Sequence, residues 1–326
     1  MTKIIHYEPT SRCNAACPMC ARNVNGDGCV VPLQDLSLEL FKTQVDASLE
    51  QLEKVFFCGA VGDPCADKTL LEKIQWLKQQ REDIVICINT NGSIRNPTWW
   101  NRCGQLLSGI YDYVVFSIDG LEDTHSRYRV NTNWNKIIDN AKTFIEAGGE
   151  ARWDMLVFQH NQHQLEDCRA LSKELGFKEF QVKHTTRFRD GKFDVIDENW
   201  NKVDTLYPSD KSLEMIAPAE AAREEKLPKI NCKAVEDHML YISAGGDVAP
   251  CCWLDLKWMP QLFPSKMDYM MKVKRFPNLH DESLKEIFDS GFFDLISSQW
   301  STCGLKECSK QCGSFDKLRE QFVEKK

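Results

Sequence analysis

The sequence predicts an α/β fold, a partial (βα)6 TIM-like barrel followed by a small cysteine-rich C-terminal domain. Six short apolar runs alternate with amphipathic stretches between residues 3 and 185, as parallel strands covered by helices do. Six such units are too few for a closed eight-fold barrel. Two groups of cysteines stand out from the others, one near the start and one after residue 231. A doubly wound sheet has the same periodicity and stays open as an alternative.

The six apolar runs each have the length and composition of a buried strand. They span residues 3–8, 54–58, 84–88, 113–118, 152–158 and 179–183. Helical patterns lie between them, at residues 37–52, 67–80, 97–108, 134–147 and 162–175. Gly148 and Gly176 follow two of these patterns, where a C′ glycine ends a helix. Parallel folds of either kind bind ligands at the carboxyl ends of their strands, so we expect a site in the loops that follow the strands.

Composition limits the partners and the compartment. The chain has 41 Lys and Arg against 48 Asp and Glu, a net charge of -7, which argues against a nucleic-acid partner. The start has no apolar signal-peptide region, and no stretch approaches the roughly 20 apolar residues of a membrane span. Fifteen cysteines without an export signal indicate metal ligands and buried thiols rather than disulfides. We therefore expect a cytoplasmic protein without a membrane partner.

The first cysteine group is the most informative motif. Cys13, Cys17 and Cys20 form a C-x3-C-x2-C run in the loop after the first strand. Three thiolates can hold three irons of a four-iron cluster, and no fourth cysteine follows at a ferredoxin spacing. One iron is then left open to a cofactor or substrate. The alternative is a zinc site, which usually takes two pairs of ligands, whereas here only His6 lies nearby.

This run, on a loop after the first strand of a βα repeat, resembles the radical S-adenosylmethionine (SAM) enzymes. The resemblance implies that Cys13, Cys17 and Cys20 ligate a 4Fe–4S cluster whose open iron is chelated by SAM. It also implies reductive cleavage of SAM to a 5′-deoxyadenosyl radical, which abstracts a hydrogen atom from an unactivated carbon. A reducing partner such as flavodoxin or ferredoxin would supply the electron.

A turn after the second strand extends the resemblance. Residues 59–64, Gly-Ala-Val-Gly-Asp-Pro, look like a variant of the family's Gly-Gly-Glu-Pro turn, which holds the SAM amino group. Val61 stands where the first glycine would be, and an aspartate replaces the glutamate. The cofactor-binding residues that this implies are Gly59, Gly62, Asp63 and Pro64.

Two further segments match after the third and fourth strands. Residues 89–92 resemble the Thr-Asn-Gly segment that lines the pocket, and residues 117–120 resemble the segment that binds the ribose hydroxyls. Each alone would be ordinary strand-end turn chemistry, but all occur in order behind the cysteine loop. Met19 stands where an aromatic residue often packs near the adenine. The cofactor-binding residues implied here are Met19, Asn89, Thr90, Asn91, Ser117 and Asp119.

The second cysteine group begins with a predicted hairpin over residues 239–252, whose turn is at 245–247. It resembles a SPASM/Twitch extension, which binds auxiliary four-iron clusters. Two such clusters need roughly seven or eight cysteines, so six imply one auxiliary 4Fe–4S cluster. The predicted ligands are Cys232, Cys251, Cys308 and Cys312, with Cys252 and Cys303 as possible substitutes. A zinc knuckle with similar ligands is the alternative.

The chain is thus expected to have three parts. Residues 1–185 form the radical SAM core, and residues 231–326 form the SPASM/Twitch-like domain. Residues 186–230 are rich in charge and contain three prolines, which predicts a linker or irregular crossover.

The resemblance implies an enzyme that carries out a net oxidation or modification of a peptide or protein, with help from the auxiliary cluster. The alternatives are a radical SAM dehydrogenase of a sugar-like small molecule and an iron–sulfur electron carrier without SAM chemistry. A zinc-binding interaction module is a further class, although it would not need six βα units. Candidate acid–base or substrate residues near strand ends are His160, His163, His184, Asp154, Tyr128 and Arg129, but no catalytic acid or base is assigned. Arg187 and Arg189 are candidates for binding a carboxylate or phosphate.

Overall fold

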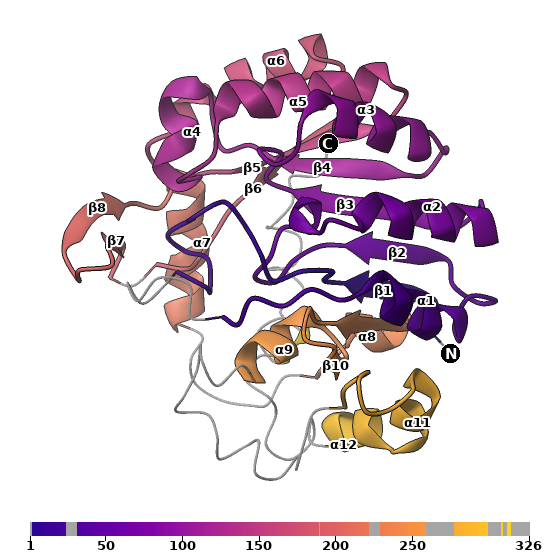
Figure 1. The fold of residues 1–326 in the computed structure, drawn as a ribbon. Helices are drawn as coiled ribbons and strands as arrows, with labels where there is room; N and C mark the ends of the chain where they lie inside the picture. Colours follow the sequence, from indigo (N-terminus) through magenta and orange to yellow (C-terminus); the bar gives the residue numbers. More distant parts are fainter. Residues whose placement is uncertain are drawn as a thin grey trace. The chain divides into compact units, whose positions relative to one another are not determined.

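The computed structural model describes residues 2–23, 31–188, 190–221, 229–258, 277–298, 308 and 312–313. The chain forms two compact units, each assembled from separate stretches of sequence (Figure 1). The first unit comprises residues 1–12, 31–88 and 226–315, and the second comprises residues 13–30, 89–225 and 316–326. The expected division into three consecutive parts stays a prediction, because these units combine stretches that are separate in the sequence and do not correspond to the parts.

A parallel sheet forms the centre of the first unit. Its strands β1 (Ile4–Tyr7), β2 (Lys54–Phe57) and β3 (Val85–Thr90) pair in that order. Ile4 lies opposite Lys54, which lies opposite Val85. All three strands coincide with apolar runs in the sequence, so these predictions are confirmed.

The hairpin predicted over residues 239–252 is also confirmed, but it has an unexpected neighbour. Strand β9 (Met239–Ile242) pairs with the antiparallel β10 (Val248–Ala249) and, on its other side, runs parallel to β1. Ile4 lies opposite Met239. The start of the cysteine-rich tail is therefore part of the same sheet as the first strand of the chain.

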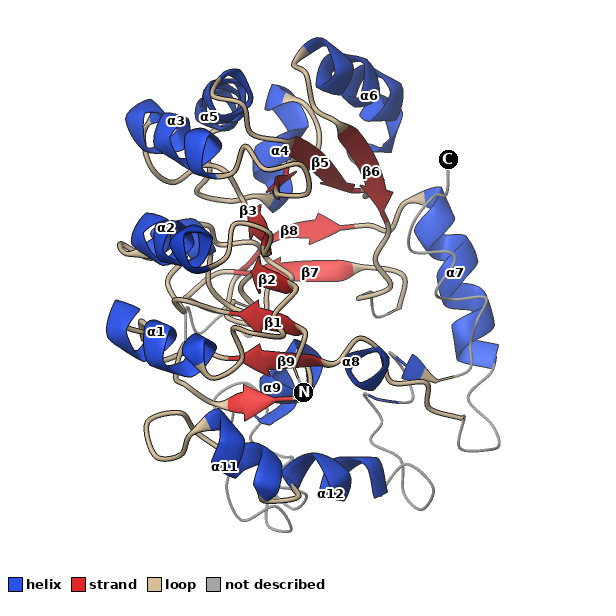
Figure 2. Cartoon of the chain, turned by 90° about the vertical axis from the view of Figure 1, so that its right-hand side faces the viewer, coloured by secondary structure: helices blue, strands red, loops and turns tan. Residues whose placement is uncertain are grey.

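Helices cover one side of this sheet. Figure 2 shows α1 (Leu38–Asp46) and α2 (Leu70–Gln80) on the same side of β1 and β2. Ser37 caps α1 by accepting a hydrogen bond from the Leu40 amide at 3.1 Å.

The cysteine-rich tail contains four further helices among its described residues, α8 (Lys233–Glu236), α9 (Cys252–Trp258), α11 (Leu284–Asp289) and α12 (Phe292–Ser298).

The second unit repeats the strand–helix pattern. Strands β4 (Tyr113–Ser117), β5 (Ala151–Leu156) and β6 (Glu179–Lys183) are parallel and adjacent. They alternate with α3 (Pro97–Leu106), α5 (Trp134–Glu146) and α6 (Leu165–Glu174), the last preceded by a 3-10 turn at Gln162–Gln164. Gly148 and Gly176 have φ values of 99° and 86°, so both end their helices as predicted.

Two parts of the second unit differ from expectation. Helix α4 (Glu122–Tyr128) was not predicted, because its polar sequence carries no apolar stripe. The expected linker contains the antiparallel strands β7 (Phe193–Ile196) and β8 (Lys202–Leu206) and helix α7 (Asp210–Ala221). The β7–β8 loop is closed by the Asp197 carboxylate, which accepts two backbone hydrogen bonds. Within the described residues, no helix is both long enough and apolar enough for a membrane span.

Candidate active site

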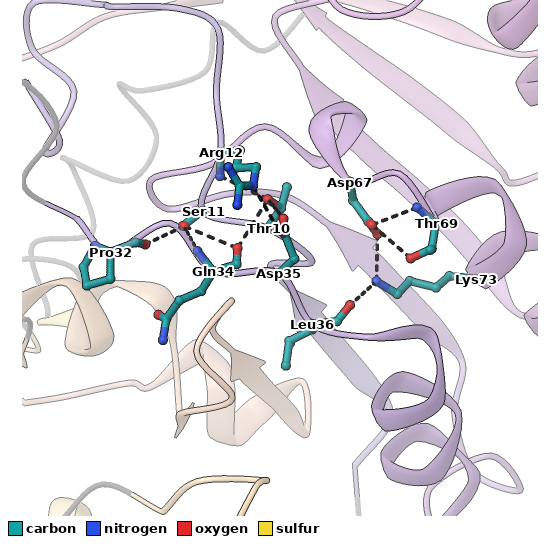
Figure 3. Close-up of polar contacts among 10 residues, drawn as sticks. All are labelled: Thr10, Ser11, Arg12, Pro32, Gln34, Asp35, Leu36, Asp67, Thr69 and Lys73. Atoms are coloured by element: carbon teal, nitrogen blue, oxygen red, sulfur yellow. Dashed lines mark hydrogen bonds and ion pairs between the residues drawn. The ribbon is translucent and has the colours of Figure 1, made fainter.

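The backbone directly before Cys13 is fixed by a network of polar contacts (Figure 3). Thr10 donates its hydroxyl hydrogen to Asp35 Oδ1 at 2.5 Å, and Arg12 Nε donates to Asp35 Oδ2 at 2.9 Å. The Ser11 hydroxyl donates to the Pro32 carbonyl and accepts from the Gln34 amide, so the facing segment is residues 32–36. The cysteine loop therefore leaves the sheet from an anchored start.

The facing segment is itself held by a buried ion pair. Lys73 Nζ, with no exposed side-chain surface, lies 2.7 Å from Asp67 Oδ2 and donates to the Leu36 carbonyl at 2.6 Å (Figure 3). Thr69 donates to the other Asp67 oxygen through both its amide and its hydroxyl. These partners offset the desolvation cost that a buried pair would otherwise carry.

The predicted turn Gly59–Pro64 lies against the same anchored segment. A Cβ on Gly62 would lie 1.8 Å from the Thr10 carbonyl oxygen, and the Asp63 amide donates to the Arg12 carbonyl at 2.8 Å. A Cβ on Gly59 would lie 1.9 Å from the carbonyl oxygen of Gly62. Both glycines are thus required by close backbone approach. The Asp63 side chain caps the 3-10 helix η1 (Pro64–Ala66) by accepting from the Cys65 amide at 2.9 Å.

In the second unit, the cysteine loop packs into an apolar cluster. Cys17 and Met19 are buried there with Tyr128 and Phe158, and Cys13 and Cys20 pack at its edge. Met19 therefore packs in the apolar surroundings of the cysteines; its predicted contact with adenine stays a prediction.

Three donors point at the cysteine sulfurs. The Ala15 amide lies 3.4 Å from Cys13 Sγ, and Asn91 Nδ2 lies 3.7 Å from the same sulfur. Arg129 Nη1 lies 3.9 Å from Cys17 Sγ. Hydrogen bonds to the sulfurs are among the means by which proteins tune iron–sulfur clusters, so this donor set fits a cluster held by thiolates. Asn91 also donates to Asn14 at 2.9 Å, which fixes the loop.

Arg129 is oriented by Asp119, which has no exposed surface. Asp119 Oδ2 accepts from Arg129 Nε at 2.5 Å, and its Oδ1 accepts from the Leu156 amide at 2.7 Å. The Asp119 amide donates to His125 Nδ1 at 3.1 Å. The structure thus links Asp119 to the cysteine loop, a role that the sequence did not predict; its predicted ribose contact stays a prediction. His125 was missed because α4 was missed.

A buried acceptor without a partner lies at the end of β3. Asn89 Oδ1 is buried and has no hydrogen-bond partner among the described residues. Such an atom costs about 1–3 kcal/mol unless a ligand or water satisfies it, so it fits a site for a cofactor that carries donors, as SAM does. Beside it, Thr90 Oγ1 accepts from the Gly92 amide at 3.0 Å, and Gly92 adopts a φ of 72°. Ser117 lies at the end of β4, as predicted.

Three arginines and the carboxylate of Asp119 lie around the cysteines. Burial raises the pKa of Cys17 to about 11, and the neighbouring Arg129 opposes the rise. Burial also raises the pKa of Cys20, against the charges of Arg22, Arg187 and Arg129. Positive charge of this kind favours the thiolates that a metal needs. Arg187 also donates to the Met19 carbonyl at 3.3 Å, while Arg189 lies outside the described residues.

The second cysteine group lies in the first unit. Cys232 contacts Cys312, whose carbonyl accepts from the Asn231 amide at 2.9 Å. Cys251 and Cys308 share an apolar cluster, to which Leu254, Phe292 and Ile296 also belong. Cys252 is partly exposed, and Cys303 lies outside the described residues. In the described part of the chain, no three His, Cys, Asp or Glu side chains are close enough to hold one metal ion.

The remaining candidates have mixed surroundings. His160 stacks on Phe158 at 5.3 Å, and burial lowers its pKa to about 4. His184 Nδ1 lies 3.3 Å from Ser209 Oγ, and Asp154 forms an ion pair with Lys183. Tyr128 belongs to the apolar cluster around the cysteines, and His163 is exposed. None of these contacts identifies an acid or base.

Comparisons with known proteins bear on this arrangement. The family model "Radical SAM superfamily" matches residues 7–171, and the model "Iron-sulfur cluster-binding domain", SPASM, matches residues 232–313. No curated protein matches the chain.

Among solved structures, Streptococcus suis SuiB bound to S-adenosylmethionine is similar, with 14% identity and a TM-score of 0.58 over 88% of this chain and 65% of SuiB. SuiB has also been solved with its precursor peptide SuiA, at a TM-score of 0.55. Native anSMEcpe with bound AdoMet and Cp18Cys peptide has 16% identity and a TM-score of 0.57, over 99% of this chain and 88% of that one. This chain thus spans about two thirds of SuiB's length.

These likenesses confirm the predicted fold class, a partial α/β barrel with a C-terminal iron–sulfur domain. The family model covers half of the chain, from β1 into α6, and includes the cysteine run. It implies a 4Fe–4S cluster and SAM as cofactors, and the SPASM match implies auxiliary iron–sulfur binding. The chain belongs to the radical SAM superfamily and carries a SPASM domain at its C-terminal end.

Proposed function

We propose that this protein uses SAM and a reduced 4Fe–4S cluster to form a 5′-deoxyadenosyl radical, and that the radical abstracts a hydrogen atom from an unactivated carbon of a peptide or protein. A flavodoxin or ferredoxin would supply the electron. One auxiliary cluster would accept the second electron of a net two-electron oxidation, and a proton would leave for solvent. Free thiols and reduced clusters call for a reducing compartment, which supports a cytoplasmic location.

The observation that carries the proposal is the set of donors aimed at the cysteine loop. Three side-chain or backbone groups point at the sulfurs of Cys13 and Cys17 from within 3.9 Å, in an apolar environment. An electron carrier would need the cysteines and their donors, but no site for an organic cofactor. The strand-end features, namely the unpartnered Asn89 oxygen and the close-packed turn Gly59–Pro64, instead support a bound organic cofactor.

In this proposal, different residues bind the cluster, bind SAM and donate a hydrogen bond to the cysteine sulfur. Cys13, Cys17 and Cys20 would hold the cluster, and the turn Gly59–Pro64 would bind the SAM amino group. Arg129, held by Asp119, would donate a hydrogen bond to the sulfur of Cys17 and lower its negative charge. The surrounding apolar side chains would keep water from the radical.

A peptide or protein substrate is the form we favour. SuiB and anSMEcpe, which share this fold, have both been solved with bound peptides. The SPASM domain fits this reading, since an auxiliary cluster gives the second electron a destination. Dehydrogenation of a sugar-like alcohol would require the same two-electron balance, so the two reactions differ only in their substrate.

Anaerobic reconstitution tests the proposal. The iron-loaded protein is mixed with SAM and dithionite, and 5′-deoxyadenosine is measured by mass spectrometry. We expect 5′-deoxyadenosine from the wild type and none after substitution of Cys13, Cys17 and Cys20 by alanine. Loaded protein that never forms 5′-deoxyadenosine would be an electron carrier instead.

The substrate class needs a separate experiment. The active protein is incubated with synthetic peptides containing serine or cysteine and, in parallel, with sugar alcohols. Loss of two hydrogens from a peptide, matched by 5′-deoxyadenosine, supports the proposal. The same loss from a sugar alcohol alone would assign the protein to small-molecule dehydrogenation.

A further inference from the structure

Glu8 is a buried carboxylate at the end of β1 that no cysteine motif predicts. It has no exposed surface, although an acidic side chain is rarely buried without a specific partner. Its Oε1 accepts hydrogen bonds from the Val61 amide at 2.9 Å and from the Gly62 amide at 2.7 Å. These two amides form the middle of the turn Gly59–Pro64.

The contact fixes a part of the turn that has no secondary structure of its own. The turn already touches residues 10–12 through the Gly62 backbone and the Asp63 amide. Glu8 adds an acceptor on the inner side, and this one oxygen holds two successive amides of the turn at once. The carbonyls of the turn are thereby held in one orientation, which is what a backbone site for an ammonium group requires.

The second oxygen of Glu8 reaches the tail of the chain. Tyr241, also without exposed surface, donates its hydroxyl hydrogen to Glu8 Oε2. Tyr241 belongs to β9, and its register partner in β10 is Ala249, two residues before the predicted cluster ligand Cys251. One side-chain bridge therefore spans from the predicted SAM turn to the strand that leads into the auxiliary cysteines.

We infer that Glu8 is a positioning residue for the turn Gly59–Pro64, and that the Glu8–Tyr241 bridge couples this turn to the SPASM domain. The assignment of the turn to SAM rests on the proposed function, but the bridge does not. Removing Tyr241's hydroxyl should therefore loosen the turn although the two are 177 residues or more apart in sequence.

Amide hydrogen exchange on the protein without clusters tests the bridge directly. We expect Glu8→Ala to raise exchange of the Val61 and Gly62 amides by about tenfold or more, because both lose their buried acceptor. Tyr241→Phe should raise it by a smaller factor, about threefold, because Glu8 remains but is no longer oriented. Glu8→Gln, whose amide oxygen can replace Oε1, should stay closer to the wild type than Glu8→Ala.

Tyr7→Phe is the matched control. Tyr7 lies next to Glu8 on β1, and its buried hydroxyl has no hydrogen-bond partner among the described residues. Its removal should leave exchange in the turn unchanged. Unchanged exchange in Glu8→Ala would overturn the positioning role. Unchanged exchange in a folded Tyr241→Phe protein, or an equal rise in Tyr7→Phe, would overturn the coupling.

A second readout uses the reconstituted protein. The dissociation constant of SAM is measured at equal iron content, and we expect Glu8→Ala to weaken binding about tenfold, in proportion to the lost order of the turn. If the wild type binds no SAM at all, the proposed function fails while the exchange result still decides the bridge. If SAM binds equally well to both proteins, the turn does not position the cofactor through Glu8.

Discussion

Asp119 illustrates how a residue can serve a site from outside it. Its two carboxylate oxygens are taken by Arg129 and by the Leu156 amide, and only Arg129 reaches a cysteine sulfur. Asp119 was predicted because residues 117–120 resemble a ribose-binding segment, and this resemblance selected the residue but not its partner. Arg129 directly follows α4, a helix whose polar sequence gave no signal.

The buried position of this ion pair predicts a large cost on breaking it. Asp119→Asn leaves the Arg129 guanidinium without its counter-charge, and we expect a loss of about 3 kcal/mol in the free energy of unfolding. Asp204→Asn is the matched control, since Asp204 pairs with Arg127 on the surface at 2.8 Å and should cost within about 1 kcal/mol. Urea unfolding of the cluster-free proteins measures both. Equal losses would contradict the assignment.

His125 gives a prediction for pH. Burial lowers its pKa from 6.5 to about 4, so the unfolded chain takes up the proton first as the pH falls. Its contribution to stability is therefore complete above pH 6.5 and is lost progressively between pH 6.5 and 4, at up to about 1.4 kcal/mol per pH unit. His125→Asn should reduce the slope of unfolding free energy against pH in that window. An identical slope in the two proteins would show that folding does not change the pKa of His125.

At the scale of elements, hydrophobic periodicity predicted where the parallel strands lie in the sequence, but it did not predict the β7–β8 hairpin or the pairing of β9 with β1. The apolar runs that became β1 to β6 were visible because parallel strands are buried on both faces. The β7–β8 hairpin was missed because Asp197 and Pro208 look like linker residues until the Asp197 carboxylate is seen to close the turn. The pairing of β9 with β1 had no local signal, since nothing in a strand's own sequence names a parallel partner.

The turn Gly59–Pro64 keeps its shape because two of its residues, Gly59 and Gly62, have no side chain. In Gly62→Ala the new Cβ would meet the Thr10 carbonyl, a backbone atom, at 1.8 Å, so we expect a loss of about 2–3 kcal/mol in stability and a displaced turn. Gly245→Ala is the control, because its new Cβ would meet only the end of the flexible Gln34 side chain at 2.8 Å. Thermal unfolding of the two variants compares them. A Gly62→Ala protein as stable as Gly245→Ala would show that the turn can move away.

At the scale of the whole molecule, the two cysteine groups lie in different compact units. The first group was readable from its spacing alone, because a C-x3-C-x2-C run places all its ligands in one loop. The second was only partly readable, since Cys232 and Cys312 are 80 residues apart and meet through the fold. Which thiols lie near one another in the tail is a tertiary property that spacing cannot give.

Because the two cysteine groups are separate, we expect each to bind its iron–sulfur cluster independently of the other. After reconstitution we expect about eight irons per chain in the wild type and about four after substitution of Cys13, Cys17 and Cys20 by alanine. Substitution of Cys232 and Cys312 should also leave about four, but with SAM cleavage retained in part. Iron and sulfide assays with matched absorption spectra measure this. Loss of all iron from either variant would mean that the two groups form one site.

The pairing of β9 with β1 also has a consequence during synthesis. Ile4 meets Met239 only after 235 further residues have been made, which takes roughly 10 to 50 seconds at ribosomal rates. Until then one edge of β1 has no neighbour, and an open edge of an apolar strand invites pairing with other chains. The nascent protein is therefore at its most vulnerable before the SPASM segment emerges, and slow translation should lower the yield of folded protein more than it would for a barrel whose first strand is completed early.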